Sequence, residues 1–162
     1  MFHNILASSS PRRKLLLNQI GFDFEIIDSK VDEHDELDFP PEAFAEFWAR
    51  KKAKAVAKLN PSSLIIGADT IVSINGKIYG KPKTEIDSID MLNCLSDKTH
   101  EVITGVSFIL LNKDIDITFN ERTFVSLSKL NENDILDYIY NYSPYDKAGS
   151  YGIQDGFSIF IK

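Results

Sequence analysis

Serine and arginine side chains lie close together near the start of the chain, in the run from Ser8 to Arg13. A serine followed by proline predicts the first turn of a helix, where unpaired backbone N–H groups and the positive end of the helix dipole are exposed. The guanidinium groups of Arg12 and Arg13 add donors that match phosphate oxygens. This segment is therefore a candidate phosphate site. The alternative is that Ser10 only caps the helix while both arginines lie in solvent.

Lys52 is a basic side chain at an unusual position. The pattern of residues 41–59 predicts a helix, and Lys52 falls on its apolar face. That face is expected to be formed by Phe44, Phe47, Trp48, Ala55 and Leu59. An inward lysine is rare unless its ammonium group reaches water or an anion. We therefore expect Lys52 to point into a cleft, and Lys51 and Lys54 to be solvated.

Asp69 follows the most apolar stretch of the chain, Leu64 to Ala68, and we expect it at the end of a buried strand. A carboxylate there must be paired, metal-bound or open to a cavity, because an unpaired buried charge is costly. Strand ends are also where α/β enzymes place catalytic groups. Alternatively, Asp69 is structural and bonds to nearby backbone. Asp32 and Glu33 offer further carboxylates in an acidic loop, where solvation is the default interpretation.

Two glycine-bearing segments could present further ligands. The segment 76–81 is not a P-loop, because its glycine spacing is one residue short and Pro82 replaces the Ser or Thr that would bind magnesium. It is typical instead of a turn that presents Lys81. The later segment 145–156 contains Gln154 among several glycines, and we expect a surface loop that could bind a ligand.

The elements that must position these side chains alternate between helices and strands. Helices are expected over residues 11–20, 41–59 and 85–95, and over a segment capped by Asn131 that carries Ile135, Leu136, Tyr138 and Ile139. Strands are expected over residues 5–7, 22–27, 64–68, 70–74, 77–79, 101–111, 115–127 and 157–161. Asn75-Gly76 predicts a two-residue hairpin turn. Helices interspersed with hairpins predict a mixed α/β sheet.

Composition narrows the class of protein. A chain of 162 residues, 43% apolar and 26% charged, predicts one globular domain. Its formal charge of −6 argues against a general DNA or RNA surface, whereas local basic clusters suit a small anionic ligand. Neither a membrane-spanning stretch nor a secretory signal is evident, so we expect a cytoplasmic protein. Cys94 and the three histidines lack zinc-site spacing, so any metal would be held by oxygen.

The chain contains five motifs in order: ASSSPRR, ARKKAKAVA, IIGADTIV, GKPK and DKAGSYGIQ. Over nearly the whole chain, they resemble the Maf family of nucleoside triphosphate pyrophosphatases. The resemblance implies a fold related to the inosine triphosphate pyrophosphatases, with two lobes around a central cleft. It also implies a homodimer that cuts a nucleoside triphosphate between the α- and β-phosphates. From composition we expect no nucleic acid polymer and no membrane as partner.

The resemblance assigns roles to individual residues. It places the substrate-binding groups at Ser8, Arg12, Arg13, Lys52, Lys81 and Gln154. Asp69 matches the catalytic aspartate of the family, and Glu33 matches an acidic position. We expect Mg²⁺ or Mn²⁺ to bridge triphosphate oxygens and to be held by Asp69 and Glu33.

The forms GADT and DKAGSYGIQ resemble the branch of the family that prefers dTTP and UTP. Two alternatives stay open: the branch that favours 7-methyl-GTP, and a nucleotide-binding regulator of septum formation without turnover. An RNA-binding module is disfavoured by the acidic balance and by the lack of an aromatic-basic stripe. We expect a single Maf-like domain over residues 1–162 that lacks the family's usual C-terminal GLPL motif and closing helix.

Overall fold

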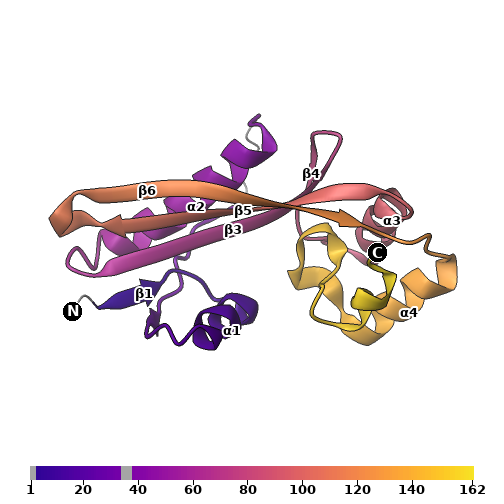
Figure 1. The fold of residues 1–162 in the computed structure, drawn as a ribbon, viewed down its shortest axis with the longest axis horizontal. Helices are drawn as coiled ribbons and strands as arrows, with labels where there is room; N and C mark the ends of the chain where they lie inside the picture. Colours follow the sequence, from indigo (N-terminus) through magenta and orange to yellow (C-terminus); the bar gives the residue numbers. More distant parts are fainter. Residues whose placement is uncertain (1–2, 34–37) are drawn as a thin grey trace. The chain divides into compact units, whose positions relative to one another are not determined.

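The computed structural model describes residues 3–33 and 38–162, so part of the expected acidic loop, including His34, lies outside the described residues. The helices within them are α1 (Pro11–Gln19), α2 (Pro41–Ala57), α3 (Glu85–Leu95) and α4 (Glu132–Tyr142). The strands are β1 (Asn4–Leu6), β2 (Glu25–Ile26), β3 (Leu64–Ile74), β4 (Lys77–Tyr79), β5 (Thr99–Leu110) and β6 (Ile115–Ser126) (Figure 1). Short 3-10 helices are η1 (Leu111–Lys113), η2 (Pro144–Asp146), η3 (Ala148–Ser150) and η4 (Gly156–Phe160).

The described strands form one sheet in the order β2-β1-β3-β5-β6, with β4 paired to β3. β1 runs parallel to both β2 and β3, whereas β4 runs antiparallel to β3. The mixed α/β class predicted from the sequence is therefore confirmed. No helix in the described part of the chain is both long and apolar enough to cross a membrane.

The chain forms two compact units. The first comprises Met1–Asp69 and Thr104–Glu121, and the second comprises Thr70–Ile103 and Arg122–Lys162. Because β3, β5 and β6 contribute residues to both units, each unit contains strands that are far apart in the sequence.

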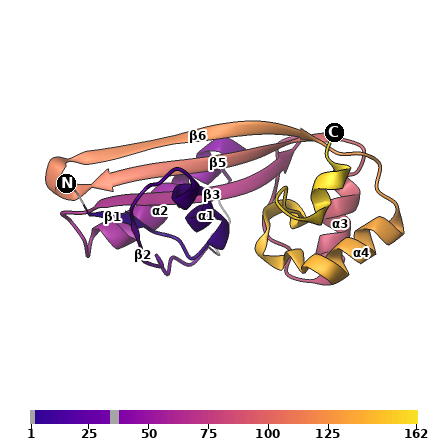
Figure 2. The same cartoon turned by 60° about the horizontal axis from the view of Figure 1, so that its bottom comes forward.

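The core of the first unit lies between α2 and the sheet. Apolar side chains from β1 and the residue after it, and from α2, β3 and β5, form this core: Ile5, Ala7, Ala53, Val56, Ala57, Ile65 and Ile109. In the views of Figures 1 and 2, α1 and α2 lie on opposite sides of β3. Two glycines let α2 approach the sheet closely. A Cβ at Gly67 would meet the carbonyl oxygen of Ala49, and one at Gly105 would meet the backbone of Ala45.

The close approach at Gly67 gives a stability prediction. Gly67→Ala is expected to lower the free energy of unfolding by about 1–3 kcal/mol, because the added methyl group meets backbone that cannot rotate away. Gly80→Ala is the matched control, since a Cβ at Gly80 has nothing within 4 Å. Urea denaturation of both variants measures the difference, and equal midpoints would show that α2 can shift without cost.

The apolar face of α2 differs from the expected one. Its buried side chains are Ala45, Trp48, Ala49, Lys52, Ala53, Val56 and Ala57. Leu59, which was expected on this face, lies beyond the helix and is 84% exposed. The reason is steric: small alanines fit against Gly67 and Gly105, whereas the rings of Phe44 and Phe47 stay half-buried at the side.

The core of the second unit joins α3, α4 and the C-terminal segment. Its largest buried members include Leu92, Leu95, Ile135, Tyr138 and Phe157. Both helices begin with a capping box, at Thr84 and at Asn131, so the cap expected at Asn131 is confirmed. The hairpin turn is also confirmed, because Asn75 and Gly76 both have positive φ between β3 and β4.

The strands differ from the expected ones in three places. β2 has two residues rather than six. Residues 157–161 are mostly a 3-10 helix, because Asp155 caps this segment by accepting a hydrogen bond from the Phe157 N–H at 3.1 Å. β3 continues without a break through Asp69 to Ile74, because the residues after Asp69 are also buried and pair with β4. Asp69 therefore lies inside a strand and not at its end.

A buried histidine in the second unit makes its stability depend on pH. His100 is 2% exposed, and its Nε2 lies 2.7 Å from the hydroxyl of Tyr151. Its Nδ1 has no hydrogen-bond partner among the described residues. Burial lowers the pKa of His100 from 6.5 to about 4, because the charged imidazolium would lose its hydration.

This lowered pKa predicts acid sensitivity. Between about pH 6.5 and pH 4 the unfolded chain binds a proton that the folded chain does not, so stability is lost as the pH falls through this range. The total loss should be about 3 kcal/mol. His100→Gln places an amide group near the position of Nε2, so it can keep the hydrogen bond with the Tyr151 hydroxyl, but it cannot titrate. Urea midpoints at pH 7.5 and pH 5 should therefore differ more for the parent chain than for the variant, and equal differences would contradict this account.

Candidate functional site

Lys52 on α2 and Asp69 on β3 form a buried ion pair in the first unit. Lys52 Nζ lies 2.6 Å from Asp69 Oδ1 and 3.0 Å from Glu33 Oε1. The side chains of Lys52 and Asp69 are only 8% and 9% exposed, whereas that of Glu33 is 45% exposed. The expectation that an inward Lys52 reaches an anion agrees with this geometry, and one ammonium group bridges two carboxylates.

The local sequence explains why these side chains meet. Side chains alternate along a strand, so Asp69 is on the same face of β3 as Gly67, the face against which α2 packs. Lys52 lies one residue before Ala53, whose backbone and Cβ lie against the Gly67 position. The missing side chain at Gly67 thus brings the helix close enough for a short contact between Lys52 and Asp69.

The start of α1 brings serine and arginine side chains together. Ser8 is buried, and its Oγ accepts hydrogen bonds from the Arg13 guanidinium at 3.0 Å and from the Ser10 N–H at 3.2 Å. Ser10 occupies the N-cap position, but its side chain makes no capping hydrogen bond. Arg12 and Arg13 are both half-buried. The alternative of a capping serine with two solvated arginines is therefore wrong.

Electrostatics link this helix start to the buried pair. Burial raises the pKa of Asp69, an effect that Lys52 and Arg13 oppose and that Glu33 reinforces. Burial also lowers the pKa of Arg13, and the charges of Asp69 and Glu33 oppose that shift. The pKa shifts of Asp69 and Arg13 each contain a contribution from the charge of the other group and from Glu33, so these charged groups form one interacting cluster. Below, "the acidic-basic cluster" means Ser8, Arg12, Arg13, Glu33, Lys52 and Asp69.

The other two expected substrate ligands, Lys81 and Gln154, lie in the second unit, and both are exposed. The Gly149 N–H donates to the Gly80 carbonyl at 2.9 Å, which joins the turn of Lys81 to the glycine-rich loop. The hydroxyl of Tyr138 holds the turn that carries Gln154. It accepts from the Gly152 N–H and donates to Asp155 Oδ2, both at 3.1 Å.

The carboxylates of the acidic-basic cluster fit a hard divalent cation. Mg²⁺ in nucleotide enzymes is commonly held by one or two carboxylates, with substrate phosphates and water completing the coordination. Asp69 and Glu33 present two carboxylates on either side of one ammonium group. Among the described residues, no group of three or more Asp, Glu, His or Cys side chains could hold a metal by itself. The two carboxylates suit a cation whose remaining ligands are oxygens of a polyphosphate.

Sequence reasoning missed the glycines that build the site. Gly67 and Gly105 had no assigned role, although a glycine inside an apolar strand often marks a close backbone approach. Lys51 and Lys54, which were expected to be solvated, are half-buried and contact neighbouring side chains. Lys51 Nζ lies 4.4 Å from the centre of the Trp48 ring, and Lys54 Nζ lies 3.2 Å from Asp116 Oδ2.

Comparison with known proteins places this geometry in a family. Residues 3–162 match the family described as Maf-like protein. A dTTP/UTP pyrophosphatase of Bacillus cereus is 49% identical over 158 residues, which cover 98% of this chain and 82% of that protein. A dTTP/UTP pyrophosphatase of Bacillus anthracis is 48% identical over the same shares of the two chains. The solved structure of the Staphylococcus aureus Ham1 protein superposes with a TM-score of 0.54 at 18% identity, covering 77% of this chain and 71% of Ham1, which confirms the expected fold.

Proposed function

Because this chain belongs to the family of Maf-like proteins, we propose that it hydrolyses UTP and dTTP to the nucleoside monophosphate and pyrophosphate. The relatives named dTTP/UTP pyrophosphatase support the substrate, since they match 98% of this chain. The structural observation that carries the proposal is the buried pair of Lys52 and Asp69 with Glu33 and Arg13 around it. Such a cluster combines a base with groups that bind phosphate.

Asp69 acts as the general base in this mechanism. It orients a water molecule and takes its proton as the water oxygen bonds to the α-phosphorus. The bond between the α-phosphorus and the bridging oxygen breaks, and its electron pair leaves with pyrophosphate. Burial raises the pKa of Asp69 and so makes the carboxylate a stronger base, while Lys52 keeps it ionised and in position.

The basic residues stabilise the charge that develops on the departing pyrophosphate. We assign this role to Arg12, Arg13 and Lys52 in the first unit and to Lys81 in the second. Ser8 orients the Arg13 guanidinium through their hydrogen bond, and Gln154 is assigned to nucleotide binding.

Asp69 and Glu33 would hold a divalent cation, and we propose Mg²⁺ or Mn²⁺. When bound, the cation would neutralise triphosphate oxygens and polarise the phosphorus centre. Lys52 lies between the two carboxylates and keeps their oxygens close together. By resemblance to the family we also propose a homodimer in the cytoplasm.

A substrate panel tests the proposed function. Pyrophosphate release is measured from UTP, dTTP, CTP, GTP, ATP and 7-methyl-GTP, with and without Mg²⁺. We expect UTP and dTTP to be the best substrates and Mg²⁺ to be required. Preference for 7-methyl-GTP would assign the chain to the other branch of the family. A nucleotide-dependent rise in melting temperature without pyrophosphate release would identify a binding protein and overturn the enzyme proposal.

A further inference from the structure

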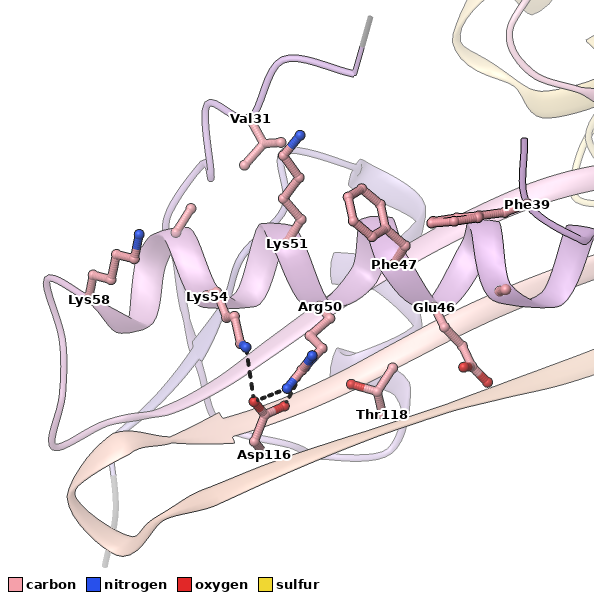
Figure 3. A pocket seen from close by; sticks show the side chains of 12 residues that line it. Val31, Phe39, Glu46, Phe47, Arg50, Lys51, Lys54, Lys58, Asp116 and Thr118 are labelled. Carbon is pink, nitrogen blue, oxygen red and sulfur yellow. Dashed lines mark hydrogen bonds and ion pairs between the residues drawn. The ribbon is translucent and has the colours of Figure 1, made fainter. Parts of the chain in front are cut away.

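A groove lies on the face of α2 that points away from Lys52. Its lining residues recur along one side of the helix, and Lys52 is about half a helical turn away from them. The cavity has a volume of about 810 Å³, within the range of about 300–1,000 Å³ typical of small-molecule sites. Its lining side chains all belong to the first unit: Val31, Phe39, Ala43, Glu46, Phe47, Arg50, Lys51, Lys54, Ala55, Lys58, Asp116 and Thr118 (Figure 3).

One end of the groove is aromatic. The rings of Phe39 and Phe47 meet edge to face with their centres 5.5 Å apart, and Figure 3 shows them side by side at the cavity. Phe39 is exposed although it is a large apolar side chain. Aromatic faces of this kind are where planar rings of ligands stack.

The other end of the groove is cationic. The Arg50 guanidinium forms two hydrogen bonds with the Asp116 carboxylate, at 2.8 and 2.6 Å, and Lys54 Nζ lies 3.2 Å from the same group. These two cations balance the negative charge of the Asp116 carboxylate, so it does not repel an anion. Among the residues that the structure describes, four basic and two acidic side chains line the groove, a formal charge of +2 on a chain whose total charge is −6. The groove is thus a local exception to the acidic balance.

We propose that this groove is a second, non-catalytic binding site for a nucleoside monophosphate. The base would stack at Phe39 and Phe47, and the phosphate would lie between Lys54 and Lys58. A phosphate monoester carries a charge near −2 at neutral pH, which matches the charge of the groove. Phe47 and Lys54 are two helical turns apart, or about 10 Å, a spacing that suits a compact ligand with its ring and its anionic group at opposite ends.

The choice of UMP as the ligand rests on the proposed function, because UMP would be the product of UTP hydrolysis. The groove lies on the opposite face of α2 from the acidic-basic cluster, so occupancy of the groove and turnover can be measured separately. The chain has one tryptophan, Trp48, whose ring contacts both Phe47 and Lys51. Its fluorescence should therefore report a ligand that moves either neighbour.

The experiment titrates the whole chain with UMP, uridine and inorganic phosphate and follows Trp48 fluorescence. UMP is expected to bind saturably, and uridine or phosphate alone at least tenfold more weakly, because each engages only one end of the groove. In the variant Lys54→Gln/Lys58→Glu the affinity for UMP should fall at least tenfold, with pyrophosphate release from UTP unchanged. The exposed Lys113, outside the groove, supplies the matched control Lys113→Glu, which should bind UMP like the parent chain.

Unchanged UMP affinity in the double variant would place the bound nucleotide elsewhere and overturn the proposal. An absence of saturable binding up to millimolar UMP would overturn it as well. Failure of the proposed function looks different, since pyrophosphate release would then be absent in every variant while UMP binding still responded to the charge changes in the groove.

Discussion

Asp69→Asn is expected to lower pyrophosphate release from UTP by about 100-fold or more, because positioned general bases contribute about 10²–10⁴ in rate. The asparagine has nearly the same shape but can neither accept the proton of the attacking water nor neutralise Lys52. The fold should persist, since Glu33 still faces Lys52 at 3.0 Å. Turnover at saturating UTP and the thermal midpoint of the same sample measure both effects.

A second carboxylate in the first unit provides the control. Asp114 lies exposed in the left-handed conformation after η1, a conformation that asparagine adopts as readily as aspartate. Asp114→Asn should therefore leave turnover within about twofold. If Asp69→Asn also turned over at a normal rate, Asp69 would have no part in the chemistry.

Lys52→Met is expected to lower the free energy of unfolding by about 3 kcal/mol, because it leaves the buried Asp69 carboxylate without its closest counter-charge. Without the Lys52 ammonium group to oppose the effects of burial and of Glu33, the pKa of Asp69 would rise further, so the base would be protonated over a wider pH range. Turnover should fall strongly, and the acid limb of its pH profile should move to higher pH. Urea denaturation and the pH dependence of kcat measure these two results.

A double variant separates the loss of charge pairing from the loss of packing. Lys52→Met/Asp69→Asn has no unpaired buried charge, so it should regain at least half of the stability lost in Lys52→Met. Lys113→Met controls for removing a lysine at an exposed position. If the double variant were as unstable as Lys52→Met, packing of the lysine stem would explain the effect and the ion pair would not.

Elements with strong local signals were predictable from the sequence. The bounds of α3 match the expected ones, and the Asn75-Gly76 turn has the expected positive φ angles. The helix after Asn131 has its cap as expected, because capping depends on residues three positions apart. These features need no knowledge of distant contacts.

Features that depend on distant contacts were not predictable in the same way. The buried face of α2 is set by Gly67 and Gly105 on two strands. Apolar periodicity alone therefore placed Phe44 and Phe47 on this face, although both are only half-buried. Asp69 was expected at a strand end because the local sequence does not show that the residues after it continue the strand and pair with β4. The bridge from Lys52 to Glu33 joins a loop to a helix and has no sequence signature. The single domain and the central cleft implied by the family stay predictions, as do the roles of the site residues.

Hydrolysis of UTP in ¹⁸O-labelled water tests the central claim most directly, because the position of the label reports which phosphorus atom the water attacks. Attack at the α-phosphorus places one ¹⁸O in UMP and none in pyrophosphate. Mass spectrometry of the two products reads this result. Label in pyrophosphate, or UDP and inorganic phosphate as the products, would contradict it.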